Sequence, residues 1–178
     1  REVLETFIKI TESLAEIHSH GIVHKDINTS NILWLEENKQ PVIIDFGIST
    51  KLNLKSHNLG NPDRLQGTLA FMPPEQTGRV NRKIDNRSDL YSLGVSLYQV
   101  LTGKLPFEAS DSLEMVHFHI AKTAIPVVQL DHEIPKVVSQ IVVKLLEKDA
   151  ENRYQSASGL MTDLSNCLKQ LDEKGKVT

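Results

Sequence analysis

Apolar residues recur at helical spacing near the start of the chain. They stand three or four positions apart, at Leu4, Phe7, Ile10, Leu14 and Ile17. This period is typical of an amphipathic helix with one buried face. Gly21 follows, and glycine commonly stands just beyond the last turn of a helix. The pattern therefore predicts a first helix that ends before Gly21.

A different pattern follows this helix. Residues 32–35 and 41–44 are two short apolar runs, and the polar residues 36–40 lie between them. Such an arrangement predicts two strands joined in a hairpin. From Asp45 to about Arg87 the sequence shows little periodicity, with scattered glycine, proline, asparagine and serine. We expect a long ordered loop there, and loops of that length usually carry function.

The second half of the chain predicts a helical domain. Residues 90–103 contain no charged side chain, so this helix should be buried on all sides, with Asp89 at its amino-terminal end where the helix dipole favours a carboxylate. Three more amphipathic helices are predicted over residues 111–122, 135–147 and 156–171. The expected fold is mainly α, with about six helices around the buried central helix plus a small β-hairpin. We expect one domain over residues 1–171, followed by a polar, frayed tail over residues 172–178.

Composition narrows the classes of function. The 178 residues carry a formal net charge of -3, with both signs interspersed, which does not fit a nucleic-acid-binding protein with a basic face. One cysteine leaves no disulfide framework. No stretch approaches the roughly 20 apolar residues that span a membrane. We therefore expect no nucleic-acid partner, no membrane segment in this chain and a cytoplasmic location.

Two polar segments carry the candidate chemistry. Residues 24–31 read His-Lys-Asp-Ile-Asn-Thr-Ser-Asn, and residues 45–47 read Asp-Phe-Gly. Taken alone, Asp26 and Asn31 fit equally well a polar turn whose side chains bond locally, and Asp45 fits a strand end that turns at Gly47. Four later segments remove this ambiguity. They are residues 67–75, 88–94, 103–107 and 151–154.

In order and spacing, these six motifs resemble those of the C-terminal lobe of protein kinases of the serine/threonine class. The resemblance implies magnesium-dependent transfer of the γ-phosphate of ATP to a protein serine or threonine. It assigns Asp26 to the proton of the acceptor hydroxyl, Asn31 and Asp45 to magnesium, and Leu33 to the nucleotide site. Asn28 and Thr68 complete the implied catalytic set.

Other roles implied by the resemblance are structural. His24 and Phe46 would stack in a hydrophobic column between two lobes, next to Gly47. Asp89 would hydrogen-bond the backbone of the 24–31 loop. Glu75 and Arg153 would form a buried ion pair, which matters for folding more than for chemistry because losing one partner strands the other charge.

The sequence departs from the family pattern in three ways. Lys25 replaces an arginine that clamps phosphorylated loops, which puts activation by loop phosphorylation in doubt. Asn28 replaces a lysine that steadies the transferring phosphate, and asparagine brings no positive charge. The glycine-rich loop and nucleotide-anchoring lysine belong to an N-terminal lobe, which is absent here. We therefore expect the isolated chain to bind ATP poorly and to transfer no measurable phosphate.

A narrower resemblance concerns the parent protein. Residues 24–34 and 68–94 look like the N-terminal kinase-like domain of large bacterial sensor proteins, in which ATPase, sensory and histidine kinase modules follow. The implied partners are a protein substrate, the missing N-terminal lobe and those modules. Two alternatives stay open: a pseudokinase or regulatory interaction module, favoured by Asn28, and a truncated product with no function of its own.

Overall fold

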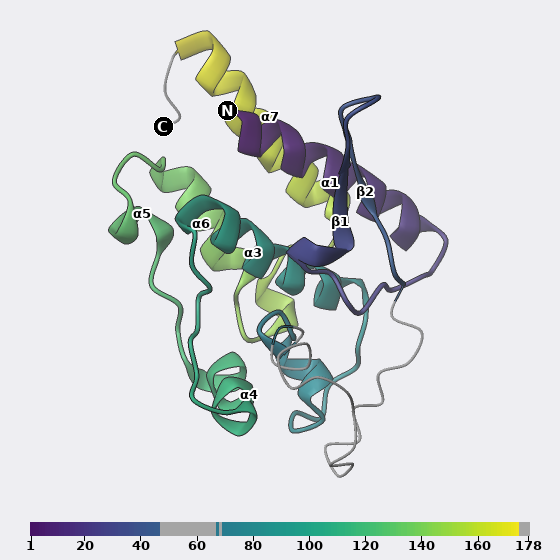
Figure 1. The fold of residues 1–178 in the computed structure, drawn as a ribbon, viewed down its shortest axis with the longest axis vertical. Coiled ribbons are helices and arrows are strands. Elements are labelled where there is room, and N and C mark those ends of the chain that lie inside the picture. The colour runs from purple at the N-terminus through teal and green to yellow at the C-terminus, as the bar shows by residue number, and fades with distance from the viewer. Residues whose placement is uncertain (47–66, 68, 175–178) are drawn as a thin grey trace.

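A computed structural model of the chain describes residues 1–46, 67 and 69–174. Helices dominate this part, with one two-stranded antiparallel sheet (Figure 1). The mainly α fold with a small hairpin is confirmed. The α-helices are α1 (Glu2–Ser19), α3 (Asn86–Thr102), α4 (Ser112–Ala121), α5 (Val127–Leu130), α6 (Lys136–Leu145) and α7 (Ala157–Lys174). None of these described helices is both long and apolar enough to cross a membrane.

Helix α3 is the buried centre of the fold. Every residue from Ser88 to Tyr98 is buried, because the helix packs against α1, α5 and α6. It begins at Asn86, earlier than the sequence predicted, and Asp85 caps it by accepting a bond from the Arg87 amide at 3.0 Å. Asp89 lies inside the first turn, at the amino-terminal end of the helix as predicted. The helix ends at Gly103, whose φ of 69° is the left-handed conformation that glycine adopts without strain.

Helix α1 follows the predicted apolar stripe. Leu4, Phe7, Ile10 and Leu14 are buried, and the helix packs against α7 and the second strand. Figure 1 shows purple α1 and yellow α7 side by side. Helix α7 continues to Lys174, so the first three residues of the predicted polar tail are helical. Residues 175–178 lie outside the described part.

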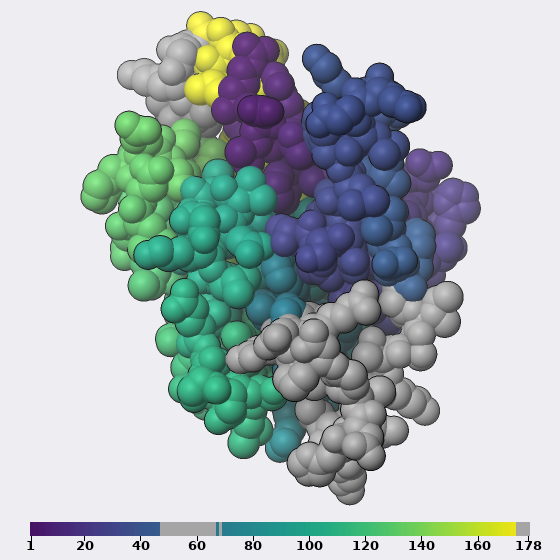
Figure 2. Space-filling model, in the orientation of Figure 1, coloured from purple at the N-terminus to yellow at the C-terminus, as the bar shows by residue number. Residues whose placement is uncertain are grey.

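The β-hairpin packs against α1. Strand β1 (Ile32–Leu35) pairs antiparallel with β2 (Gln40–Ile43), with Ile32 opposite Ile43 and Leu35 opposite Gln40. The Lys9 ammonium on α1 donates to the Lys39 carbonyl at 2.8 Å and so ties the turn to the helix. On the face drawn in Figure 2, the blue hairpin atoms lie at the surface beside purple α1.

Three short 3₁₀ helices connect the larger elements of the described chain. They are η1 (Thr29–Asn31), η2 (Pro74–Thr77) and η3 (Ala150–Asn152). The expected loop from Asp45 to Arg87 therefore contains η2 and the start of α3, and Leu69 to Met72 within it are buried. Helix α5 was not predicted, because four residues after a proline carry too little periodicity to indicate a helix.

Candidate functional site

The 24–31 loop is shaped by its own side chains. Asn28 caps η1, since its Oδ1 accepts bonds from the Ser30 and Asn31 amides at 3.0 and 3.1 Å. Its Nδ2 donates to both the backbone oxygen and the Oδ1 of Asp26, each at 3.1 Å. Lys25 next to Asp26 has a φ of 70°, a conformation uncommon outside glycine and often found at functional sites. Asn28 is thus buried and committed to the loop itself.

Asp26 is held from two sides. Asn28 reaches one carboxylate oxygen, and the Asn31 Nδ2 donates to Oδ2 at 2.9 Å and to the backbone oxygen at 2.8 Å. Partial burial raises the pKa of Asp26, against the opposing effect of the bonds from Asn31 and Asn28 and of nearby His24, while the Asp45 charge raises it further. A raised pKa makes the ionised carboxylate a stronger proton acceptor.

Asp89 anchors this loop to the central helix. Its side chain is 1% exposed, and it accepts the His24 amide at Oδ2 and the Lys25 amide at Oδ1, both at 2.8 Å. The His18 Nε2 on α1 also contacts Oδ2 at 2.9 Å. The two amide bonds fix the backbone on the amino-terminal side of Asp26, and the contact with His18 holds the Asp89 carboxylate. From η2, the Gln76 Nε2 adds a bond to the Lys25 carbonyl at 2.9 Å.

His24 joins the loop to the end of β2. Its Nε2 lies 3.1 Å from the Ile44 carbonyl, and its Nδ1 accepts the Asp26 amide at 3.3 Å. One neutral tautomer, protonated at Nε2, satisfies both bonds. The ring also contacts Phe46 with 4.7 Å between centroids. The two ring planes are tilted by 40°, and the role of this pair in a column between two lobes stays a prediction.

Two oxygen-bearing side chains belong to segments that are joined by a backbone hydrogen bond. The Ile44 amide donates to the carbonyl of Asn31 at 2.9 Å, and Asp45 directly follows Ile44 in the sequence. Asp45 is exposed and has a φ of 55°. Magnesium prefers hard oxygen ligands and is held by few protein groups together with waters and phosphates. An amide oxygen and a carboxylate fit that donor set.

Glu75 and Arg153 form the predicted ion pair. The guanidinium is bidentate to the carboxylate at 2.7 and 3.0 Å, and Ser88 Oγ donates to Oε1 at 2.7 Å. Arg153 directs its other donors to three carbonyls, those of Glu147, Arg87 and Lys148. Burial raises the pKa of Glu75, but the hydrogen bonds and charge of Arg153 outweigh it and hold the pKa below its ordinary value.

Two other predicted residues are largely exposed. Leu33 on β1 is 46% exposed, and Phe46, which contacts His24, is 45% exposed. Gly47 and Thr68 fall outside the described residues. His18 and Gln76 were missed by the sequence reasoning, because each meets its partner across more than fifty positions of chain and no local pattern signals such a contact.

Comparisons with known proteins show the family of the chain. The family model for the protein kinase domain matches residues 1–164. A probable serine/threonine-protein kinase of Clostridium perfringens is 35% identical over 91% of this chain and 23% of its own length. The serine/threonine-protein kinase PknB of Mycolicibacterium smegmatis is 30% identical over 92% of this chain and 26% of its own. The chain thus spans about a quarter of these relatives.

A third relative is named as a different kind of kinase. The hybrid signal transduction histidine kinase G of Dictyostelium discoideum is 47% identical over 104 residues. The match covers 58% of this chain and 3% of that protein. It is therefore a high local similarity inside a far longer protein.

Proposed function

The chain belongs to the protein kinase domain family, and from this premise we propose that it is the catalytic C-terminal lobe of a serine/threonine protein kinase. The proposed reaction moves the γ-phosphate of ATP to a protein serine or threonine. The observation that carries it is the Asp26 carboxylate, held by Asn28 and Asn31 on a loop that Asp89 anchors. Such positioning is most of what phosphoryl transfer asks of a protein.

The chain's own residues would act as follows. Asp26 accepts or orients the proton of the attacking hydroxyl, since each carboxylate oxygen keeps a second lone pair beside its bond to an asparagine. Asn31 and Asp45 would hold a magnesium ion, which when bound neutralises charge on the phosphates. Leu33 offers an exposed apolar surface for the nucleotide base. Thr68 is proposed from family resemblance to complete the catalytic set.

The structural residues support that site. Asp89 and His24 hold the loop, and Phe46 and Gly47 continue from Asp45. Glu75 and Arg153 lock the segment that leads into α3. The proposed partners are a protein substrate and an N-terminal lobe over the exposed hairpin, and the proposed location is the cytoplasm.

A second candidate function is a pseudokinase or regulatory module. The observation that favours it is Asn28, whose amide makes four hydrogen bonds inside the loop. It therefore offers no charge and no spare donor proton to a phosphate. Slower transfer is expected from this loss of a cation.

We also propose a multidomain signalling parent with ATPase, sensory and histidine kinase modules. Support comes from the similarity to a histidine kinase of Dictyostelium discoideum and from the length of the relatives. Sequencing the gene on both sides of this region tests it. Flanking sequence without such modules would remove the proposal.

A phosphate-transfer assay tests the main proposal. The natural protein, extended upstream to include an N-terminal lobe, is incubated with γ-labelled ATP, magnesium and a general protein substrate. We expect label on serine or threonine that disappears in Asp26→Ala and persists in Glu151→Gln, a change at an exposed surface position. A folded extended protein that transfers nothing would support the pseudokinase instead. The isolated chain is expected to show weak ATP binding by calorimetry and no turnover.

A further inference from the structure

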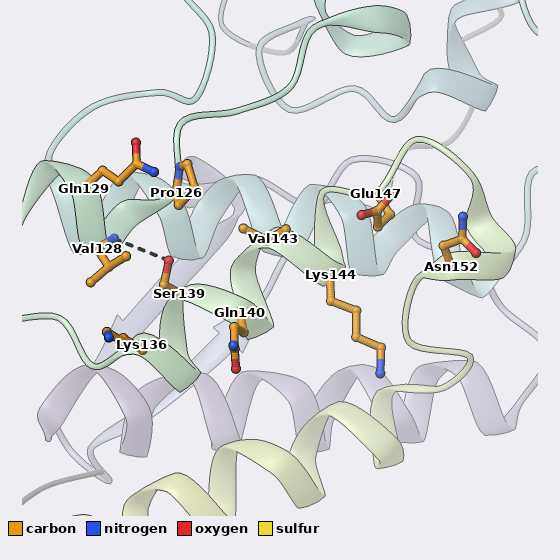
Figure 3. Close-up of a pocket in the computed structure, with 10 residues that line it drawn as sticks. All are labelled: Pro126, Val128, Gln129, Lys136, Ser139, Gln140, Val143, Lys144, Glu147 and Asn152. Atoms are coloured by element: carbon orange, nitrogen blue, oxygen red, sulfur yellow. Dashed lines mark hydrogen bonds between the residues drawn. The ribbon is translucent and has the colours of Figure 1, made fainter. Parts of the chain in front are cut away.

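A groove lies between α5, α6 and η3, away from the 24–31 loop. Its volume is about 490 Å³. Figure 3 shows Ser139 and Val143 near its middle, with Lys136, Gln140 and Lys144 along one side. Pro126, Gln129, Glu147 and Asn152 stand on the opposite side and at the end. None of these residues takes part in the proposed phosphate transfer.

One wall of the groove carries two cations. Lys136 and Lys144 are both exposed on α6 and eight positions apart, which is about 12 Å along a helix axis. Neither ammonium forms an ion pair among the described residues. The Lys144 Nζ rests 4.2 Å from the centre of the Tyr154 ring, which fixes its position at one end.

Three carboxamides line the same groove from three different elements. They are Gln129 on α5, Gln140 on α6 and Asn152 on η3. Within the described part of the chain, no hydrogen bond involves their side-chain amides. A carboxamide presents one acceptor and two donor protons, and a peptide group presents one of each. Three such groups suit a ligand whose backbone is itself an array of amides.

The floor between these polar groups is apolar. Val143 is 37% exposed, whereas Val138 and Val142 on the same helix are buried. Pro126 and Val128 lie beside it, and the Val128 amide is turned toward Ser139 Oγ at 3.4 Å, which holds α5 against α6. The floor can take one medium-sized apolar side chain.

We propose that this groove binds an extended acidic segment of a partner protein. Carboxylates four residues apart in an extended chain stand about 13 Å apart, close to the axial separation of about 12 Å between the two lysine positions on α6. The apolar residue midway between them meets Val143, and the carboxamides bond the peptide backbone. Glu147 on the opposite side of the groove repels the carboxylates of the peptide. These carboxylates therefore face the side that carries Lys136 and Lys144. The site acts independently of phosphate transfer.

A titration of the full 178-residue chain tests the groove. The probe is the capped peptide acetyl-Glu-Ala-Leu-Ala-Glu-amide, followed by amide chemical shifts in NMR. We expect saturable shifts at Val128, Gln140 and Val143. The double variant Lys136→Glu/Lys144→Glu should weaken binding about tenfold, as expected for two exposed charge pairs reversed. The matched control Lys83→Glu/Lys104→Glu makes the same charge change elsewhere and should leave binding within about twofold.

Several results would overturn the groove as a docking site. One is the absence of saturable shifts. Another is a set of shifts centred on the hairpin or the 24–31 loop. Equal weakening of peptide binding by both double variants would show that the loss of affinity comes from the net charge of the protein rather than from the groove. Equal binding of acetyl-Gln-Ala-Leu-Ala-Gln-amide would show that the two lysines do not recognise the carboxylates of the peptide.

Discussion

The surroundings of Asp26 disfavour the ionised form of its carboxyl group. Half-burial disfavours the ionised form, and the Asn28 and Asn31 amides only partly compensate. The ionised form of such an aspartate destabilises the fold relative to its protonated form. Such local cost is common where a group serves chemistry rather than stability. The same carboxylate is the one that we propose to meet the acceptor hydroxyl.

The first prediction concerns this charge. Because the folded pKa of Asp26 is raised, its stabilising contribution is fully present below the ordinary value of 3.8 and is lost as the pH rises through the folded value. Asp26→Asn cannot titrate. The variant should therefore gain stability relative to wild type as the pH rises through that window, in urea unfolding measured from about pH 4 to about pH 7. A difference that stays constant with pH would contradict the raised pKa.

The second prediction concerns the anchor of the loop. Asp89→Ala leaves the buried His24 amide and the Lys25 amide without an acceptor. Each buried donor left unpaired costs about 1–3 kcal/mol. We expect a loss of that order in unfolding free energy, together with faster hydrogen exchange at these two amides. Glu12→Ala, on the exposed face of α1, should stay within about 0.5 kcal/mol. Unchanged exchange at His24 and Lys25 would show that other contacts hold the loop.

At the scale of elements, α3 and α6 pack in close contact at Gly94. A methyl group placed on Gly94 would lie 2.6 Å from Leu145 Cβ, well inside van der Waals contact. Glycine weakens a helix interior by roughly 0.5–1 kcal/mol relative to alanine. Its presence in the buried centre of α3 therefore reflects packing rather than helix propensity.

The third prediction compares two helical glycines. Gly94→Ala should lower stability by about 1–3 kcal/mol through overpacking, despite the better helix propensity of alanine. Gly159→Ala should raise it by about 0.4–1 kcal/mol, since the nearest atom to its new methyl is Ser156 Oγ at 3.5 Å. Thermal or urea unfolding of both variants measures the contrast. Equal effects at the two sites would mean that α3 and α6 can move apart freely.

Elements with strong periodicity could be predicted from the sequence, and contacts across the fold could not. The stripe from Leu4 to Leu14 predicts α1, and the run without charges after Asp89 predicts a buried helix. The start of α3 was missed because its first turn, with Asn86 and Arg87, is as polar as a loop. Asn28 shows a subtler limit. Its bonds make a self-satisfied polar turn, and the same bonds orient Asp26, so the two interpretations of the loop do not exclude each other.

At the scale of the whole molecule, one ion pair joins distant parts of the chain. Glu75 lies in η2 and Arg153 directly after η3, 78 positions later. Ser88 at the start of α3 donates to the same carboxylate. The guanidinium also bonds three backbone carbonyls around it. The pair therefore fixes η2, and with it the buried segment from Leu69 to Met72, against the helical body.

The last prediction is a double-mutant cycle on this pair. Glu75→Gln or Arg153→Met alone strands a buried partner and should cost about 3–5 kcal/mol. The double variant should cost clearly less than the sum, because neither charge is then left alone. Recovery should still be incomplete, since a methionine side chain donates nothing to the three carbonyls that Arg153 satisfies. Because the pKa of Glu75 lies below its ordinary value, the contribution is present above that value and falls as the pH drops toward the folded pKa. Additive costs would mean that Glu75 and Arg153 stabilise the fold through separate neighbours rather than through each other.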